Sequence, residues 1–240
     1  MKGDPAVRSS LSTSRFGVPI AHVNLDRGDE LEGIVRRARS GDVAMVVVRL
    51  DAGDLDSAGR LEAAGARLCD TLVYWSRAVP ADESVSDRIR EAAPADAEVV
   101  ATIARLAFAG YQGHFQADPR LDRAAADEVY ADWARRSCED GSDRVWLADD
   151  EGPAGFLAMR FNGPEESEIL LNAVRPDRQR RGLYPLLVGA ALDASTRSGV
   201  SRCLVSTQLH NLPVQKVWSR MGFEPASAVH TFHLWLDIAR

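Results

Sequence analysis

Cysteine is scarce in this 240-residue sequence, which contains only Cys69, Cys138 and Cys203. The three lie far apart and form no Cys-x-x-Cys pair, so the sequence predicts neither a disulfide framework nor a zinc site. We therefore expect reduced, structural cysteines and no bound metal ion.

Long apolar runs and an excess of positive charge are also lacking. No window approaches roughly eighteen consecutive apolar residues, and the first residues, MKGDPAVRSSLSTSRFG, contain no apolar signal-peptide core. We therefore expect a cytoplasmic protein without a membrane span. The formal net charge of −6 argues against binding to nucleic acids or anionic membranes, because both require a broad basic field.

Strand and helix patterns alternate in the first part of the chain. The hydrophobic share of 45% and the charged share of 27% are ordinary for a globular protein. Runs of β-branched residues at 17–23 and 43–48 indicate strands, with a helical pattern over 29–40 between them. A helix over 55–64 and a strand over 67–76 are expected next.

A segment rich in Pro, Ser and acidic residues at 77–87 has the composition of a connector between two cores. We predict an N-terminal α/β domain over 1–80 and a second, mixed α/β domain with a central sheet over 81–240. In the second domain the patterns predict strands at 88–92, 144–149, 154–161, 168–174, 202–207 and 228–236, and helices at 96–108, 122–137, from 182 and from 211.

The stretch RPDRQRRGLYPLLVGAAL, at 175–192, places four arginines in seven positions before a glycine and an apolar helical pattern. A helix N-terminus has free amides and the positive end of the helix dipole, so it attracts anions. Gly182 lets those amides approach a phosphate closely, and Arg178, Arg180 and Arg181 can add charge-assisted hydrogen bonds. The alternative is a solvated charged turn. A strand leads directly into the segment, where α/β folds place ligands, which favours the anion site.

The stretch LLNAVRPDRQRRGLYPLLVGAAL resembles motif A of the GNAT superfamily of acyl-CoA-dependent N-acyltransferases, whose Q/R-x-x-G-x-G/A loop binds the pyrophosphate of coenzyme A. The sequence departs from the motif at Tyr184, where glycine or alanine is usual, and there the backbone amide would face the phosphate. The match falls on Gln179, Arg180, Arg181, Gly182 and Leu183.

A second stretch, NLPVQKVWSRMGF, resembles the pattern N-x-x-A-x-x-x-Y-x-K-x-G-F of the same superfamily, with Arg220 in the lysine position. The resemblance covers about 86–238. It implies a GNAT fold, with a central mixed sheet flanked by helices, and acetyl-CoA as co-substrate. An echo between 60–75 and 217–236 leaves open whether the smaller α/β domain before it is a truncated GNAT-like half.

More narrowly, the chain resembles nucleotide-sugar N-acetyltransferases of the TDP-fucosamine acetyltransferase type. The resemblance rests on SRFGVPIAHVNL, HFQADPRLDRAAADEVYADWARRS and STQLHN. It implies direct attack by a primary amine of a small molecule, in this group an amino-sugar nucleotide, on the acetyl group. We expect a monomer or a homodimer.

Amine acetylation requires an uncharged amine and a donor for the developing oxyanion. The resemblance places Glu168 as the general base, although a solubilising glutamate at a strand edge is the alternative. It assigns the oxyanion donor to the backbone amide of Asn172, freed by a strand bulge. Ala173 and Val174 would offer backbone groups to the pantetheine arm of coenzyme A.

The resemblance also places Asn211 and Trp218 at the cofactor. Trp218 stands where many members have a tyrosine that protonates the leaving thiolate, and an indole N–H cannot serve as that acid. Ser219 or a water could substitute, while Trp218 could simply pack. A thiol with a pKa of about 8.5 also leaves readily as the anion.

On the acceptor side we expect His114, Tyr130 and Trp133 from the early helices, and His210 as a further base candidate. Two alternatives to an amino-sugar nucleotide remain open. The acid-rich region 122–151 favours a cationic acceptor, such as an aminoglycoside-like or peptide amine. The departures at Tyr184 and Trp218 also fit a module that binds acyl-CoA without turnover.

Overall fold

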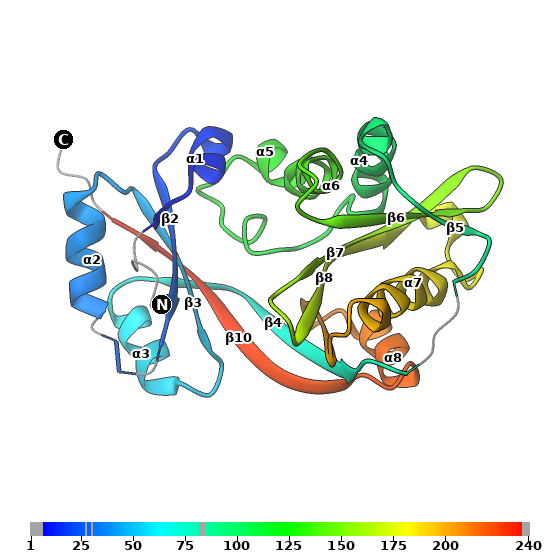
Figure 1. The fold of residues 1–240 in the computed structure, drawn as a ribbon. Coiled ribbons are helices and arrows are strands. Elements are labelled where there is room, and N and C mark those ends of the chain that lie inside the picture. The colour runs from blue at the N-terminus through cyan, green and yellow to red at the C-terminus, as the bar shows by residue number, and fades with distance from the viewer. Residues whose placement is uncertain (1–6, 27, 30, 82–84, 237–240) are drawn as a thin grey trace.

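The computed structural model describes residues 7–26, 28–29, 31–81 and 85–236, and the described strands form one mixed sheet (Figure 1). The strand order is β1-β2-β3-β10-β4-β9-β8-β7-β6-β5. The strands are β1 (Val7–Arg8), β2 (Ile20–Leu25), β3 (Met45–Asp51), β4 (Arg67–Ala78), β5 (Ile89–Glu91), β6 (Arg144–Asp149), β7 (Pro153–Phe161), β8 (Glu166–Val174), β9 (Arg202–Gln208) and β10 (Glu224–Trp235).

Helices cover both faces of this sheet, which confirms the expected mixed α/β fold. They are α1 (Ser10–Phe16), α2 (Leu31–Ser40), α3 (Leu55–Ala63), α4 (Ala97–Ala107), α5 (Arg123–Asp127), α6 (Val129–Glu139), α7 (Leu183–Arg197) and α8 (Leu212–Arg220). None of the helices in the described part of the chain is long and apolar enough to cross a bilayer.

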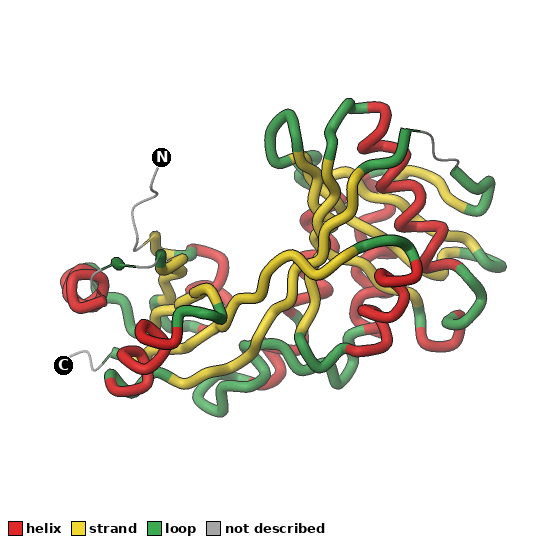
Figure 2. The backbone as a smooth tube through the Cα atoms, turned by 90° about the horizontal axis from the view of Figure 1, so that it is seen from below, coloured by secondary structure: helices red, strands yellow, loops and turns green. Residues whose placement is uncertain are grey.

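Strands from both ends of the chain are interleaved in the sheet. The last strand, β10, pairs antiparallel with β3 on one side and with β4 on the other, and β4 in turn pairs with β9. Figure 2 shows long strands that run from one lobe of the molecule into the other. The division at residue 80 therefore stays a prediction, because one backbone ladder continues through both parts.

Each lobe has its own packing. In the smaller lobe, α2 and α3 cover one face of β2, β3 and β10, while Phe115 and Leu121, from the loop after α4, pack on the other. In the larger lobe, α4 and α6 cover one face of β6, β7 and β8, and α7 covers the opposite face. The loop after α4 thus brings residues of the larger lobe onto the smaller one.

Two local features differ from the sequence patterns. The first is α1, which was not expected. Its N-terminus is capped by the Ser9 side chain, which accepts a hydrogen bond from the Ser12 amide, and Arg15 near its end forms an ion pair with Asp132 of α6. The second is the helix expected over 122–137, which breaks at Glu128 into α5 and α6.

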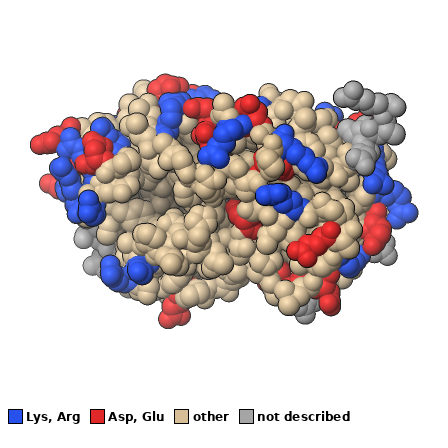
Figure 3. Space-filling model, turned by 180° about the vertical axis from the view of Figure 1, so that it is seen from behind, with Lys and Arg blue, Asp and Glu red and all other residues tan. Residues whose placement is uncertain are grey.

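The surface has no broad basic field on the face drawn in Figure 3, where basic and acidic side chains are interspersed. That pattern agrees with the negative formal charge of the chain. It gives no support to a nucleic-acid partner.

We predict that Phe232→Ala lowers the free energy of unfolding by about 3–5 kcal/mol. Phe232 is 1% exposed on β10 and packs in the core beneath α2 and α3, so the change leaves a cavity. Urea denaturation measures the loss. The control Leu55→Ala, at a side chain 72% exposed, should change stability by about 0.5 kcal/mol or less. A similar small effect at Phe232 would contradict the packing.

Candidate active site

The parallel strands β8 and β9 pair at their beginnings and then part. Their ladder runs from Glu166 opposite Arg202 to Ile169 opposite Val205 and ends there, although both strands continue. A cleft of about 600 Å³ opens beyond that point. Its lining includes the end of β8, the start of α7 and part of α8.

The edge of β8 that faces this cleft has backbone groups without a partner strand, although the Val174 carbonyl accepts a hydrogen bond from Gln179 Nε2 at 3.2 Å. The amide of Arg175 donates to the carbonyl of Ala154 on the β7 side. Since successive amides along a strand point to opposite edges, the amides of Asn172 and Val174 point away from β7, toward the cleft. Ala173 turns its own backbone groups toward β7 and lines the cleft through its side chain. A register shift between β7 and β8, which leaves Leu170 as an extra residue, precedes Asn172.

The N-terminus of α7 lies at the same cleft. Gly182 caps the helix with a φ of 77°, and Arg180 before it has a φ of 63°. No side chain caps this helix, so its first amides are available to a ligand. Gln179, Arg180, Gly182 and Leu183 all line the cleft, as the motif predicts for a phosphate site.

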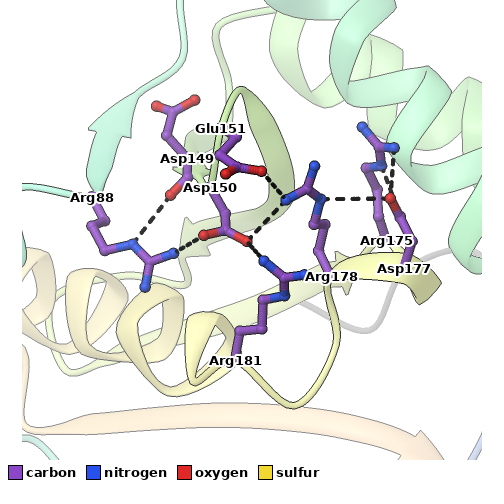
Figure 4. Close-up of polar contacts among 8 residues, drawn as sticks. All are labelled: Arg88, Asp149, Asp150, Glu151, Arg175, Asp177, Arg178 and Arg181. Carbon is purple, nitrogen blue, oxygen red and sulfur yellow. Dashed lines mark hydrogen bonds and ion pairs between the residues drawn. The ribbon is translucent and has the colours of Figure 1, made fainter.

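The neighbouring arginines are held by acidic residues (Figure 4). Arg181 pairs with Asp150 at 2.9 Å, and Arg178 pairs with Glu151 at 2.9 Å. Arg181 does not line the cleft, whereas Arg178 and Arg180 do. Arg180 forms no ion pair within the described residues. Of the cluster, Arg180 is thus the guanidinium best placed to bind a phosphate, and the ion pairs shape the turn around it.

A second cavity, of about 280 Å³, adjoins the cleft. We call it the acceptor cavity. Both spaces are lined by Asn172 and Asn211, so they meet at the amide expected to bind the oxyanion. Four residues predicted for the base or the acceptor line this cavity: Glu168, His114, Tyr130 and Trp133.

Two predicted residues lie away from both spaces. Ser219 and His210 are exposed, and neither lines the cleft or the acceptor cavity. Ser219 follows Trp218 on α8, whose buried side points inward, so its own side chain faces outward. His210 precedes Asn211 in the loop after β9, where Asn211 alone reaches the cavities.

Tyr184 and Trp218, the two residues that depart from the motifs, contact each other. Trp218 is 1% exposed and lines the acceptor cavity, and its Nε1 donates a hydrogen bond to the Tyr184 hydroxyl at 2.7 Å. Tyr184 lines the cleft. Burial raises the pKa of Tyr184, so the hydroxyl keeps its proton. Sequence reasoning considered only the Tyr184 amide and missed this hydroxyl donor.

A chain of buried hydrogen bonds ends at the acceptor cavity. Asp118 accepts from Trp235 Nε1 and from the Arg120 amide, as a carboxylate does. Burial alone would raise the pKa of Asp118. Hydrogen bonds from His233 and Trp235 nevertheless bring this pKa well below its usual value. His233 therefore carries its proton on Nδ1 and donates to Asp118 at 2.8 Å.

The direction of these hydrogen bonds determines which ring nitrogen of His114 carries a proton. In the neutral form of His233 that this bond to Asp118 selects, Nε2 accepts from His114 Nδ1 at 2.9 Å. The second ring nitrogen of His114 is then a free proton acceptor at the cavity. Burial is the main cause that lowers the pKa of His114 well below its usual value, and His233 and Arg49 add to it.

Comparisons with known proteins agree with this geometry. Residues 107–223 match the Acetyltransferase (GNAT) family. This chain contains a GNAT acetyltransferase domain. A curated relative, the spore coat polysaccharide biosynthesis protein SpsD of Bacillus subtilis, is 25% identical over 142 residues, which are 59% of this chain and 48% of the relative. The chain thus spans about half the length of that protein.

Solved GNAT structures show the same fold over most of this chain. A tandem GNAT protein from the clavulanic acid biosynthesis pathway aligns with a TM-score of 0.56 and 17% identity, over 90% of this chain and 75% of its own. A GCN5-related N-acetyltransferase from Kribbella flavida aligns with a TM-score of 0.57 and 16% identity, over 90% of this chain and 80% of its own. At these identities the likeness shows the fold alone.

One group beside the GNAT site has the composition of a metal site. Ligand atoms of Cys69, Asp118 and His233 lie within 4.8 Å of one another. Both ring nitrogens of His233 are already hydrogen-bonded, to Asp118 and to His114. A metal ion would have to break that chain, so the geometry favours hydrogen bonding over metal binding here.

We predict that the stability of the GNAT domain falls as the pH falls below about 6.5, the ordinary histidine pKa. The unfolded chain takes up a proton at His114 there and the folded protein does not, so the loss reaches at most about 1.4 kcal/mol per pH unit for one such group. Urea denaturation between pH 7.5 and 5.5 measures it. His114→Gln should flatten the slope and the exposed His210→Gln should not; equal slopes would refute the assignment.

Proposed function

We propose that this GNAT domain transfers the acetyl group of acetyl-CoA to a primary amine of a small molecule by direct attack, with an amino-sugar nucleotide as the acceptor. One observation carries the proposal: a cleft with an anion-binding helix terminus meets a separate polar cavity at the Asn172 backbone. A donor and an acceptor could therefore approach each other from two sides.

The residues of the cleft fit coenzyme A. The uncapped amides of α7, with Gln179, Arg180 and Gly182, would hold the pyrophosphate. The amide of Val174, on the edge of β8 that has no partner strand, would donate to a carbonyl of the pantetheine arm, as a strand partner does, while the Val174 carbonyl is held by Gln179. When bound, acetyl-CoA supplies the thioester.

The acceptor cavity offers groups for the proton and for the negative charge. The amide of Asn172 belongs to a strand paired with β7 and points away from β7 where the two spaces meet, which suits an oxyanion donor. Glu168 and the free ring nitrogen of His114 both reach the cavity and can each accept a proton from the amine. The Tyr184 hydroxyl lies at the cleft, where a departing thiolate needs a proton.

The position of the acidic residues in 122–151 bears on which kind of acceptor the cavity suits. The acidic region 122–151 does not favour a cationic acceptor, because none of its described Asp or Glu side chains lines this cavity. Its acids are engaged elsewhere: Asp132 and Glu128, for example, form ion pairs with arginines. The printed name of the curated relative, a polysaccharide biosynthesis protein, supports a sugar acceptor.

Release of free coenzyme A from acetyl-CoA, measured against amino-sugar nucleotides, aminoglycosides and peptides, tests the proposal. Turnover with amino-sugar nucleotides alone supports it. Preference for aminoglycosides or peptides would show that the acceptor is one of those amines and not an amino-sugar nucleotide. Tight binding of acetyl-CoA without turnover on any amine would favour a binding module.

We predict that Glu168→Gln lowers kcat and shifts the pH profile of the rate upward. A neutral amide cannot accept the amine proton, so more of the amine must already be deprotonated in solution. The drop expected for a lost general base is about 10²–10⁴-fold. Glu98→Gln, an exposed change on α4, is the control. An unchanged profile would remove Glu168 from the proton transfer and leave His114 as the base.

We predict that Gly182→Ala weakens coenzyme A binding about 5- to 30-fold, measured by calorimetry, since a side chain disfavours the φ of 77° by about 1–2 kcal/mol. Gly199→Ala is the matched control. Gly199 has a φ of 72°, and at both glycines the space around an added Cβ is open. Only Gly182→Ala should lose affinity, because only there must binding restore the disfavoured φ. Equal affinities would exclude this turn from the binding site.

A further inference from the structure

Three polar residues lie in a row across the floor of the acceptor cavity. Arg49 of β3 is directly opposite Thr231 of β10, and Thr231 is directly opposite Asp70 of β4. Residues opposite one another in a sheet project from the same face. Arg49 and Asp70 both line the cavity, and Thr231 is fully buried between them.

Each residue of this row has a buried polar atom without a hydrogen-bond partner in the described part of the chain. The atoms are Arg49 Nε, Thr231 Oγ1 and Asp70 Oδ1. Buried polar atoms are nearly always satisfied by protein, water or a ligand. Three such atoms on adjacent strands, two of them on residues that line the cavity, point to a polar partner that binds from the cavity.

The two ends of this row carry opposite charges. Arg49 is the one cationic side chain among the described residues that line the acceptor cavity, and it forms no ion pair within them. Asp70 is oriented by Gln208, whose Nε2 donates to Asp70 Oδ2 at 3.4 Å, so Oδ1 is the oxygen left free. The row therefore offers a cationic donor at one end and an anionic acceptor at the other.

The two ends of the cavity suit different parts of one molecule. Asn172 and Glu168 are on β8, where the amine would react, whereas Arg49 is on β3 of the smaller lobe. A guanidinium without a partner binds phosphate or carboxylate oxygens strongly. A free carboxylate oxygen beside it accepts a hydrogen bond from a hydroxyl.

We propose that the row Arg49–Thr231–Asp70 is an acceptor subsite for an oxyanion group, phosphate or carboxylate, with an adjacent hydroxyl. This inference rests on the proposed function and deepens it: the smaller lobe selects acceptors that carry a negative charge away from the reacting amine. Arg49 binds the oxyanion, and Asp70 binds the hydroxyl.

The test compares three acceptors with the full-length protein: glucosamine, glucosamine phosphate and glucosaminuronic acid. The wild type should show a kcat/KM for a charged acceptor about 10- to 100-fold above that for glucosamine, which is the range for one charge-assisted contact. Preference for the phosphate or for the uronic acid identifies which oxyanion the subsite takes. Equal values for all three acceptors would overturn the proposal without any variant.

Substitution then assigns the effect to Arg49. Arg49→Gln should raise the KM for the preferred charged acceptor about 10- to 100-fold, raise the KM for glucosamine far less, and leave the KM for acetyl-CoA unchanged, because Arg49 does not line the cleft. Arg49→Lys should restore part of the affinity. Arg37→Gln, an exposed change on α2 with the same loss of charge, is the control. Equal losses on charged and neutral acceptors in Arg49→Gln would show a structural role and refute the subsite.

Calorimetry separates this inference from the proposed function. If no amine is acetylated, the proposed function fails, and binding of glucosamine phosphate to the wild type and to Arg49→Gln still tests the subsite. Binding that depends on Arg49 supports it. Absence of binding, or equal binding by the two proteins, refutes it.

Discussion

The parting of two parallel strands determines the rest of the site. While β8 and β9 pair, their backbone groups satisfy each other, and past Ile169 and Val205 they cannot. The edge of β8 then needs another partner, and the same opening leaves space for a cleft. The N-terminus of α7 lies at that opening because the chain turns directly from the end of β8 into the helix.

The second constraint is the insertion of β10 between β3 and β4. It joins the smaller lobe to the larger one by a backbone ladder instead of a flexible linker. The floor of the acceptor cavity is therefore built by strands from both parts of the chain, and the loop that carries His114 and Asp118 closes over it. Arg49 and Glu168 thereby line one cavity although they come from the two parts of the chain.

Much of the fold follows from local patterns, because most helices and strands have apolar residues at the expected spacing. Local patterns could not give the place of β10 in the sheet, since strand neighbours depend on contacts between distant segments. The same limit explains α1. Its seven residues, SLSTSRF, are poor in strong helix formers, and the helix depends on contacts with α6 and Phe115.

In the site, the motif residues at the cleft were accessible to sequence reasoning because one contiguous segment builds the turn before α7. The acceptor cavity draws single residues from many elements and has no such signature. One signal was present for Arg49: a lone charged residue inside the apolar run VAMVVVRL. The hydrogen-bond partner of Trp218 could not be predicted from the sequence, because Trp218 and Tyr184 lie on two different helices.

The interleaved sheet also sets a length requirement on the acceptor. Arg49 is on β3 and Asn172 is on β8, with β10, β4 and β9 between them, and at about 4.8 Å per strand their backbones lie on the order of 19 Å apart across the sheet. An α-amino acid, whose amine and carboxylate are attached to one carbon, is too short to contact both. In the proposed reaction an acceptor must therefore reach from the amine at Asn172 toward Arg49, and the spacing of the strands favours sugar-sized acceptors with a distant oxyanion.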